Sequence, residues 1–158
     1  MTDNNARVPV EERYFEDYAV GSVYESGTIG VTEEEIIEFG KRYDPQVFHT
    51  DPAGARKTVF GGLIASGWHT AALESRLFKD HFLSKMGSLG SPGIDELRWL
   101  EPVRPGDRLR IQVTVLETRR SGSKPDRGVV RTFTKVMNQN GQVVMTVKGA
   151  TIVQCRKP

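Results

Sequence analysis

The spacing of hydrophobic positions along the chain changes once, near Ile94. Upstream of this point apolar residues recur at helical spacing, as Ile36, Phe39 and Tyr43 do. Downstream, apolar and polar residues alternate with a period of two, most clearly over residues 109–115. The order is therefore an extended N-terminal part, then helices, then a run of antiparallel strands. This order predicts an α+β fold in which one long helix packs against one sheet.

The clearest local helix signal begins at Thr32. Thr32 and Glu35 have the spacing of a capping box, in which the hydroxyl and the carboxylate each accept a backbone N–H of the other residue. We predict a helix from here to about Tyr43. A second, longer helix is predicted over residues 63–82, where most positions are apolar or small and a sheet can approach closely.

Short runs of alternating or β-branched residues predict the strands. Asn140-Gly141 is a strong hairpin signal between the last two of them. The strands or extended pieces are expected at 14–20, 22–29, 94–100, about 109–115, 129–137 and 142–153.

The length of 158 residues predicts a single domain spanning residues 1–158, with residues 1–12 as a polar, flexible arm. The net charge of +2 argues against a nucleic-acid-binding surface. Cys155 is the sole cysteine, which excludes an internal disulfide framework and a cysteine-rich zinc site. No apolar run approaches the roughly 20 residues of a membrane span, and the arm does not resemble a signal peptide. We therefore expect a cytoplasmic protein with no membrane partner.

The segment from Tyr43 to His49 contains the first candidate chemistry. Pro45 ends the preceding helix and pushes Asp44 out of the helical region. His49 follows within one turn, so a carboxylate and an imidazole can hold one water between them, as general acid–base chemistry requires. The alternative is structural, because an aspartate before a proline is often a turn residue and a histidine there is often a buried hydrogen-bonding group.

The glycine pair that precedes the predicted long helix is a second candidate. The predicted helix has free backbone N–H groups at its N-terminus, directly after Gly61 and Gly62, so an anionic or polarised oxygen could bind there, although a Gly-Gly pair is also a common loop. His69 is expected near the site, where a core or interface hydrogen bond is favoured over chemistry. The histidines and carboxylates lack the spacing of a metal site.

The segment from Tyr43 to Pro52, followed by the segment from Phe60 to Gly67, resembles the MaoC-like dehydratase family. This family contains relatives of (R)-specific enoyl-CoA hydratases with the hot-dog fold. The resemblance covers about residues 15–153, including the turn at 103–107. It implies a curved antiparallel sheet wrapped around a long central helix, and assembly as a homodimer or a dimer of dimers.

The resemblance implies reversible hydration of a 2-enoyl thioester of coenzyme A or acyl-carrier protein, without a cofactor other than the coenzyme A of the substrate. Asp44 and His49 would be catalytic, with His49 as the base toward water, since imidazole titrates at about pH 6.5. Asp44 could donate a proton only if burial raised its pKa. Gly61 or Gly62 would stabilise the thioester oxygen. The expected pocket residues are Tyr43, Phe48, Phe60, Ser66 and His69.

Two positions depart from many active members, which have Asn-Pro inside the turn and a histidine before the first glycine. Here Gln46 follows Asp44-Pro45, and Phe60 precedes Gly61. A hot-dog thioesterase and a non-catalytic module that binds acyl thioesters are the alternative functions. The candidates for the coenzyme A phosphates are Arg119, Arg120, Lys124 and Arg127, or else Arg56 and Lys57.

Overall fold

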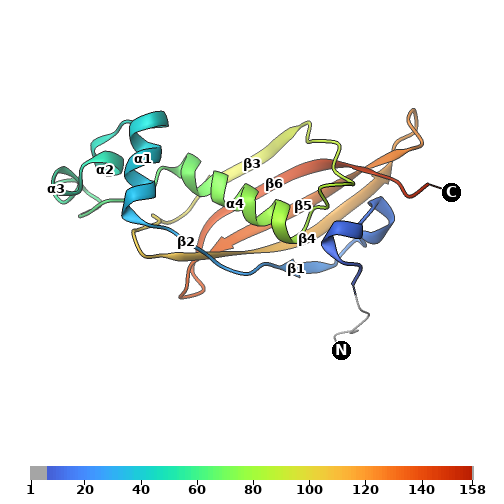
Figure 1. The fold of residues 1–158 in the computed structure, drawn as a ribbon, viewed down its shortest axis with the longest axis horizontal. Coiled ribbons are helices and arrows are strands. Elements are labelled where there is room, and N and C mark those ends of the chain that lie inside the picture. The colour runs from blue at the N-terminus through green and yellow to red at the C-terminus, as the bar shows by residue number, and fades with distance from the viewer. Residues whose placement is uncertain (1–6, 158) are drawn as a thin grey trace.

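Residues 7–157 are described by the structure, a computed structural model, and they form one antiparallel sheet with a long helix across one of its faces (Figure 1). The strands are β1 (Val23–Glu25), β2 (Ile29–Gly30), β3 (Gly93–Trp99), β4 (Arg108–Arg120), β5 (Arg127–Met137) and β6 (Val143–Gln154). Their order is β1-β4-β5-β6-β3, and β2 also pairs with β4. This arrangement confirms the predicted α+β fold. Among residues 7–157, no helix has the length and apolar content needed to cross a membrane.

Strand β4 forms because its alternating residues place one apolar row against the core. Leu109, Ile111, Val113 and Val115 are fully buried, while their neighbours are exposed or half-buried. The predicted hairpin between β5 and β6 is also confirmed. Gly141 adopts the left-handed φ of +74° that this turn requires.

Helix α1 (Glu33–Tyr43) starts at the predicted capping box. The N–H of Glu35 donates to Thr32 Oγ1 over 3.2 Å, and the N–H of Thr32 donates to Glu35 Oε2 over 3.1 Å. Two short helices follow, α2 (Val47–Thr50) and α3 (Pro52–Ala55). Together these three helices lie beyond one end of the sheet (Figure 1).

The central helix α4 (Gly67–His81) begins four residues later than predicted. Residues 63–66 are extended instead of helical, because their backbone groups are bound elsewhere. The N–H of Ile64 donates to the Phe48 carbonyl over 2.9 Å, and the N–H of Ala65 donates to the Val103 carbonyl over 2.8 Å. Ser66 then caps the helix by accepting the N–H of Trp68.

The N-terminal part differs most from its prediction. Residues 1–6 of the predicted arm lie outside the described residues, but Val10–Glu12 is a 3-10 helix, and the Glu11 carbonyl accepts a hydrogen bond from Ser84 Oγ. The strand predicted at 14–20 is wrong. Phe15–Asp17 is a second 3-10 helix, because the Asp17 carboxylate accepts the N–H of Tyr14 and so favours a local turn over sheet pairing.

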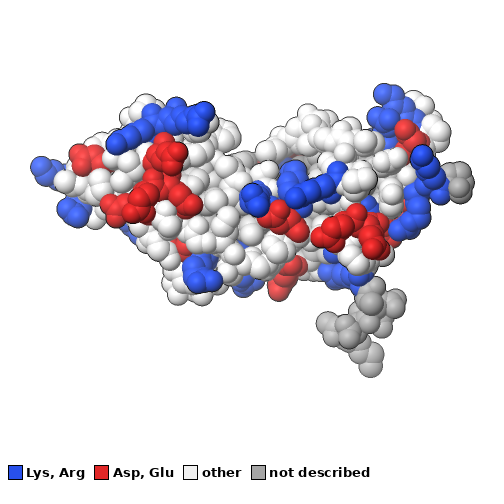
Figure 2. Space-filling model, in the orientation of Figure 1, with Lys and Arg blue, Asp and Glu red and all other residues white. Residues whose placement is uncertain are grey.

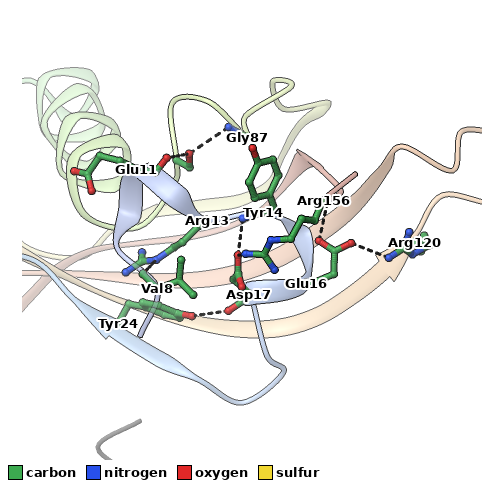
Figure 3. Close-up of polar contacts among 11 residues, drawn as sticks. Val8, Glu11, Arg13, Tyr14, Glu16, Asp17, Tyr24, Gly87, Arg120 and Arg156 are labelled. Carbon is green, nitrogen blue, oxygen red and sulfur yellow. Dashed lines mark hydrogen bonds and ion pairs between the residues drawn. The ribbon is translucent and has the colours of Figure 1, made fainter. Parts of the chain in front are cut away.

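Arg13 attaches this segment to the C-terminal end of α4. Its buried guanidinium donates to the carbonyls of His81 and Phe82 over 3.0 and 2.9 Å, which are among the carbonyls that a helix leaves without partners at its end. Figure 3 shows the neighbouring network, in which Glu16 accepts a hydrogen bond from the Arg120 side chain and another from the backbone N–H of Arg156. The segment is therefore fixed to the end of the molecule opposite α1–α3.

Replacing Arg13 with alanine should reduce the free energy of unfolding by about 1.5–3 kcal/mol, the scale of hydrogen bonds to a charged group. Urea denaturation measures this loss. The exposed Arg119→Ala is the matched control and should change stability little. Equal stability of the two variants would contradict the role of Arg13.

Candidate active site

The turn after α1 brings Asp44 and His49 together as the sequence predicts. Asp44 is the C-cap of α1, with its N–H on the Gly40 carbonyl, and His49 lies in α2. Asp44 Oδ2 is 3.3 Å from His49 Nε2. The histidine side chain is 5% exposed and the aspartate side chain 20%, so the pair lies at a boundary between the interior and solvent.

The protein fixes the tautomer of a neutral His49. Its Nδ1 lies 2.8 Å from the backbone carbonyl of Ile64. A carbonyl oxygen only accepts, so Nδ1 must carry the hydrogen. The lone pair of Nε2 then faces Asp44, and in this state both facing atoms are hydrogen-bond acceptors.

Gly40 allows helix α1 to contact this histidine. A Cβ at position 40 would lie 2.6 Å from the His49 carbonyl oxygen and 2.9 Å from its Cβ, closer than real side chains approach. Only glycine therefore permits α1 and α2 to pack at this distance. The helical spacing identifies position 40 as part of the buried face of α1, but not as a contact of His49.

Two side chains hold the carboxylate of Asp44. Ser66 Oγ donates to Oδ2 over 2.7 Å, and Gln46 Nε2 donates to Oδ1 over 2.8 Å. The Ser66 bond lowers the pKa of Asp44. Partial burial opposes this effect, while Gln46 and the nearby His49 add to it. Asp44 is therefore an ionised acceptor near neutral pH, and a raised pKa, which donation of a proton would require, is not found.

Ser66 joins the pair to helix α4. It is completely buried, its hydrogen points to Asp44, and its oxygen accepts the N–H of Trp68. The sequence predicted Ser66 only as a pocket residue. Gln46 departs from the family pattern, yet its side-chain amide donates a hydrogen bond to Asp44, two residues away.

A cavity of about 510 Å³ opens beside the pair. Of the predicted pocket residues, Phe48 and Phe60 line it. Tyr43 is 61% exposed and packs against Phe39 without lining the cavity. The wall consists of Asp44, Gln46, Phe48, His49, Phe60, Ile64, Ala65, Gly67, Trp68, Thr70, Trp99, Leu100, Glu101, Pro102 and Val103. Charged side chains are sparse over the first turns of α4, as the face in Figure 2 shows.

Neither predicted oxyanion glycine lines this cavity. The N–H of Gly61 is used in a turn, donating to the Thr58 carbonyl over 3.0 Å, and the helix does not begin until Gly67. The helix N-terminus that was expected to support Gly61 and Gly62 therefore lies several residues further on. Gly67, the first residue of α4, does line the cavity.

Trp99 explains why position 67 is glycine. Its indole occupies the space where a Cβ would lie, and its Nε1–H donates to the Gly67 carbonyl over 2.8 Å. Trp68 contacts Trp99 edge to face. Nothing in the local sequence indicates this contact, because 32 residues separate Gly67 from Trp99.

His69 does not face the cavity. Its buried ring stacks on Phe39, with centroids 4.9 Å apart, and burial lowers its pKa. Its Nδ1 has no hydrogen-bond partner within residues 7–157, so of the predicted core or interface hydrogen bond the core alternative is not found there, and the interface alternative stays a prediction. Within the same residues, no group of three histidine, cysteine or acidic side chains could hold a metal ion.

The two candidate sites for coenzyme A phosphates lie at different distances from the cavity. Arg56 and Lys57 are exposed directly after α3, three residues before Phe60 in the cavity wall. The other candidates, Arg119, Arg120, Lys124 and Arg127, lie at and beyond the C-terminal end of β4. The 13 residues of this strand place that end about 40 Å from its start. There Arg120 pairs with Glu16, and Arg127 pairs with Asp126.

Solved structures identify the architecture. The MaoC-like dehydratase from Rhodospirillum rubrum superposes with a TM-score of 0.85 at 40% identity, over 92% of this chain and 99% of that one. The R-hydratase PhaJ1 from Pseudomonas aeruginosa superposes with a TM-score of 0.72 at 30% identity, over 91% of this chain and 86% of that one. The long helix across an antiparallel sheet is therefore a hot-dog fold.

Sequence comparison gives the family. Residues 15–149 match the family described as MaoC like domain, and the chain belongs to this MaoC-like family. Mesaconyl-CoA hydratase from Cereibacter sphaeroides is 38% identical over 142 residues, which are 85% of this chain but 39% of that protein.

Replacing Ser66 with alanine should raise the pKa of Asp44 toward its ordinary value, because the hydrogen bond that lowers it most is lost. Carbon-detected NMR titration of the Asp44 carboxyl measures the shift directly. A carboxylate with a depressed pKa stabilises the fold above its unfolded pKa, and this contribution is lost as the pH falls through the folded pKa. In the Ser66→Ala variant, the free energy of unfolding should therefore decrease less than in the wild type as the pH falls through the pKa of Asp44.

Ser75 lies within α4, the helix that Ser66 caps, and does not contact Asp44, so Ser75→Ala is the control and should leave that pKa unchanged. The N-cap role of Ser66 adds a stability loss of about 1 kcal/mol at every pH, which is why the pKa is the decisive measurement. An Asp44 pKa equal in both variants would contradict the assignment.

Proposed function

We propose that this protein adds water to the double bond of 2-enoyl-CoA thioesters to give (R)-3-hydroxyacyl products, and that it catalyses the reverse dehydration. The observation that carries the proposal is the Asp44–His49 pair, two acceptors 3.3 Å apart at the wall of a largely apolar cavity. The hydratases and dehydratases among its relatives support the reaction class.

A water between the two side chains donates one hydrogen to Nε2 of His49 and the other to the Asp44 carboxylate. Both lone pairs of this water remain free, and one of them can attack the β-carbon of the substrate. As the new C–O bond forms, His49 takes the proton of the water, and the π electrons of the double bond move to the thioester oxygen. The Nε2–H of the resulting imidazolium then protonates the α-carbon, which restores neutral imidazole and completes the addition of one water.

The fixed surroundings of the pair support this division of roles. The Ile64 carbonyl keeps the hydrogen on Nδ1, so Nε2 is the nitrogen that accepts a proton. The ionised Asp44 positions the water and stabilises the imidazolium once it forms. The lowered pKa of Asp44 favours this role over proton donation.

The thioester oxygen gains negative charge when the enolate forms. We place the donor for it at the N-terminus of α4, where the N–H of Gly67 has no acceptor within the helix and the helix dipole favours an anion. One such donor contributes roughly 3–4 kcal/mol in enzymes that stabilise an oxyanion. Coenzyme A is part of the substrate, and its phosphates would lie near Arg56 and Lys57.

Incubation with crotonyl-CoA should remove the enoyl absorbance without releasing free thiol. His49→Ala and Asp44→Asn should each lower kcat by roughly 10²–10⁴-fold, the contribution of an acid–base group. Because both side chains hold the same water, the kcat of the double variant should be little lower than that of the less active single variant. His81→Ala, an exposed histidine at the end of α4, is the control and should retain activity.

Release of thiol would establish the thioesterase instead, and binding without either change would establish a non-catalytic module. Crotonyl-pantetheine, which lacks the nucleotide phosphates, should show a higher KM than crotonyl-CoA, and Arg56→Ala should reduce that difference. Turnover by His49→Ala at the wild-type rate would contradict the mechanism.

We also propose a homodimer or a dimer of dimers. Within residues 7–157, β3 pairs only with β6, so its other edge is open, and Ile94 and Trp99 on this strand are 59% and 47% exposed. An open apolar edge of this kind favours pairing with a second copy. Light scattering after size exclusion should give a multiple of 17.6 kDa, and a 17.6 kDa species at micromolar concentration would contradict the proposal.

A further inference from the structure

A second cavity, of about 260 Å³, lies between α4 and the inner face of strands β3, β5 and β6. Small residues on both sides create the space, namely Ala71 on the helix and Gly149 and Ala150 on β6. The full wall is Ala71, Glu74, Ser75, Phe78, Lys79, Ser91, Gly93, Ile94, Leu97, Thr132, Thr134, Val147, Gly149, Ala150 and Thr151.

The wall of this cavity is mostly apolar, but it carries polar side chains at positions where the pattern of the sheet calls for apolar residues. On β5 the buried positions alternate as Val130, Thr132, Thr134 and Val136, so two threonines replace core residues in the middle of the strand. Opposite them, on α4, lies Glu74. Buried polar groups persist where they find hydrogen-bond partners, so a wall of this kind indicates a polar occupant.

The side chain of Glu74 is half-buried, and its carboxyl group has no hydrogen-bond partner among residues 7–157. Within residues 7–157 it makes neither an ion pair nor a hydrogen bond, and Lys79 is the nearby charge that acts on it. Burial raises the pKa of Glu74 to about 7. Near neutral pH this carboxyl therefore exists in both forms, and it can donate or accept a hydrogen bond.

The two cavities lie one after the other along α4 and β3, and together they are called the groove. Gly67 and Thr70 of α4 line the first cavity, and Ala71 and Glu74 line the second, with the spacing of one helix face. The strand side repeats this order. Trp99, at the end of β3, borders the first cavity, whereas Leu97 and Ile94 border the second. From Gly67 to Glu74 the groove advances about 10 Å, which is the reach of a medium-length acyl chain.

From this arrangement, and resting on the proposed function, we propose that the acyl chain of the substrate extends along this groove and carries at its far end an uncharged hydrogen-bonding group, such as a hydroxyl, which binds Glu74 and the threonines of β5. A purely hydrocarbon end would bury the Glu74 carboxyl without a partner. Sites that bind a hydroxyl in this way discriminate strongly against analogues that lack it.

The test compares ω-hydroxylated 2-hexenoyl-, 2-octenoyl- and 2-decenoyl-CoA with the unsubstituted thioesters. For the chain that reaches Glu74, kcat/KM should favour the hydroxylated substrate by about 10–100-fold, the scale of one polar group left without its partner. Glu74→Leu should abolish or reverse this preference, and Thr134→Val, which removes one hydroxyl with little change in shape, should reduce it. Thr146→Val on β6, which does not line the cavity, is the matched control and should keep the wild-type preference.

Calorimetry with the saturated ω-hydroxyoctanoyl- and octanoyl-CoA separates this inference from the proposed function, because it requires no turnover. Tighter binding of the hydroxylated ligand to the wild type, lost in Glu74→Leu, would support the polar site even if crotonyl-CoA were not hydrated. Melting curves establish that each variant is folded. Equal or tighter binding of the unsubstituted chain by the wild type, or unaltered selectivity in both cavity variants, would overturn the proposal.

Discussion

The hydrogen bond from Nδ1–H of His49 to the carbonyl of Ile64 fixes the candidate site more than any other single contact. Ile64 belongs to the extended stretch at 63–66, which passes between α2 and the loop before β4. The same stretch ends at Ser66, whose hydroxyl caps α4 and donates to Asp44. One short piece of extended chain therefore orients both members of the pair, and a helix beginning at residue 63 could not do so.

These contacts have an electrostatic consequence. When His49 is neutral, two acceptors face each other across 3.3 Å, and a shared donor is needed to make that arrangement favourable. Water is the smallest molecule that can donate to both and still present a lone pair to the cavity. Hydrogen bonds from Ser66 and Gln46 lower the pKa of Asp44 and keep its carboxylate ionised, so a negative charge faces Nε2 of His49.

The parts of the site that are local in sequence could be predicted, and the parts that depend on the tertiary fold could not. The capping box of α1, the Asp44–His49 turn and the β5–β6 hairpin follow from a few neighbouring residues. Ser66 reaches Asp44 across 22 positions and Trp99 reaches Gly67 across 32, so no spacing rule reveals them. The start of α4 was predicted too early because apolar residues at 63–65 suit a buried extended segment as well as a helix.

We propose that a water held by Asp44 and His49 is added to the β-carbon of an intact thioester. Reaction of crotonyl-CoA in water labelled with heavy oxygen, followed by mass spectrometry of the product, tests it most directly. We expect one labelled oxygen on carbon 3 of a 3-hydroxybutyryl thioester still joined to coenzyme A, and label uptake slowed by roughly 10²–10⁴-fold with His49→Ala. Label in the carboxylate of a free acid, or label on carbon 3 with the His49→Ala protein at the wild-type rate, would contradict it.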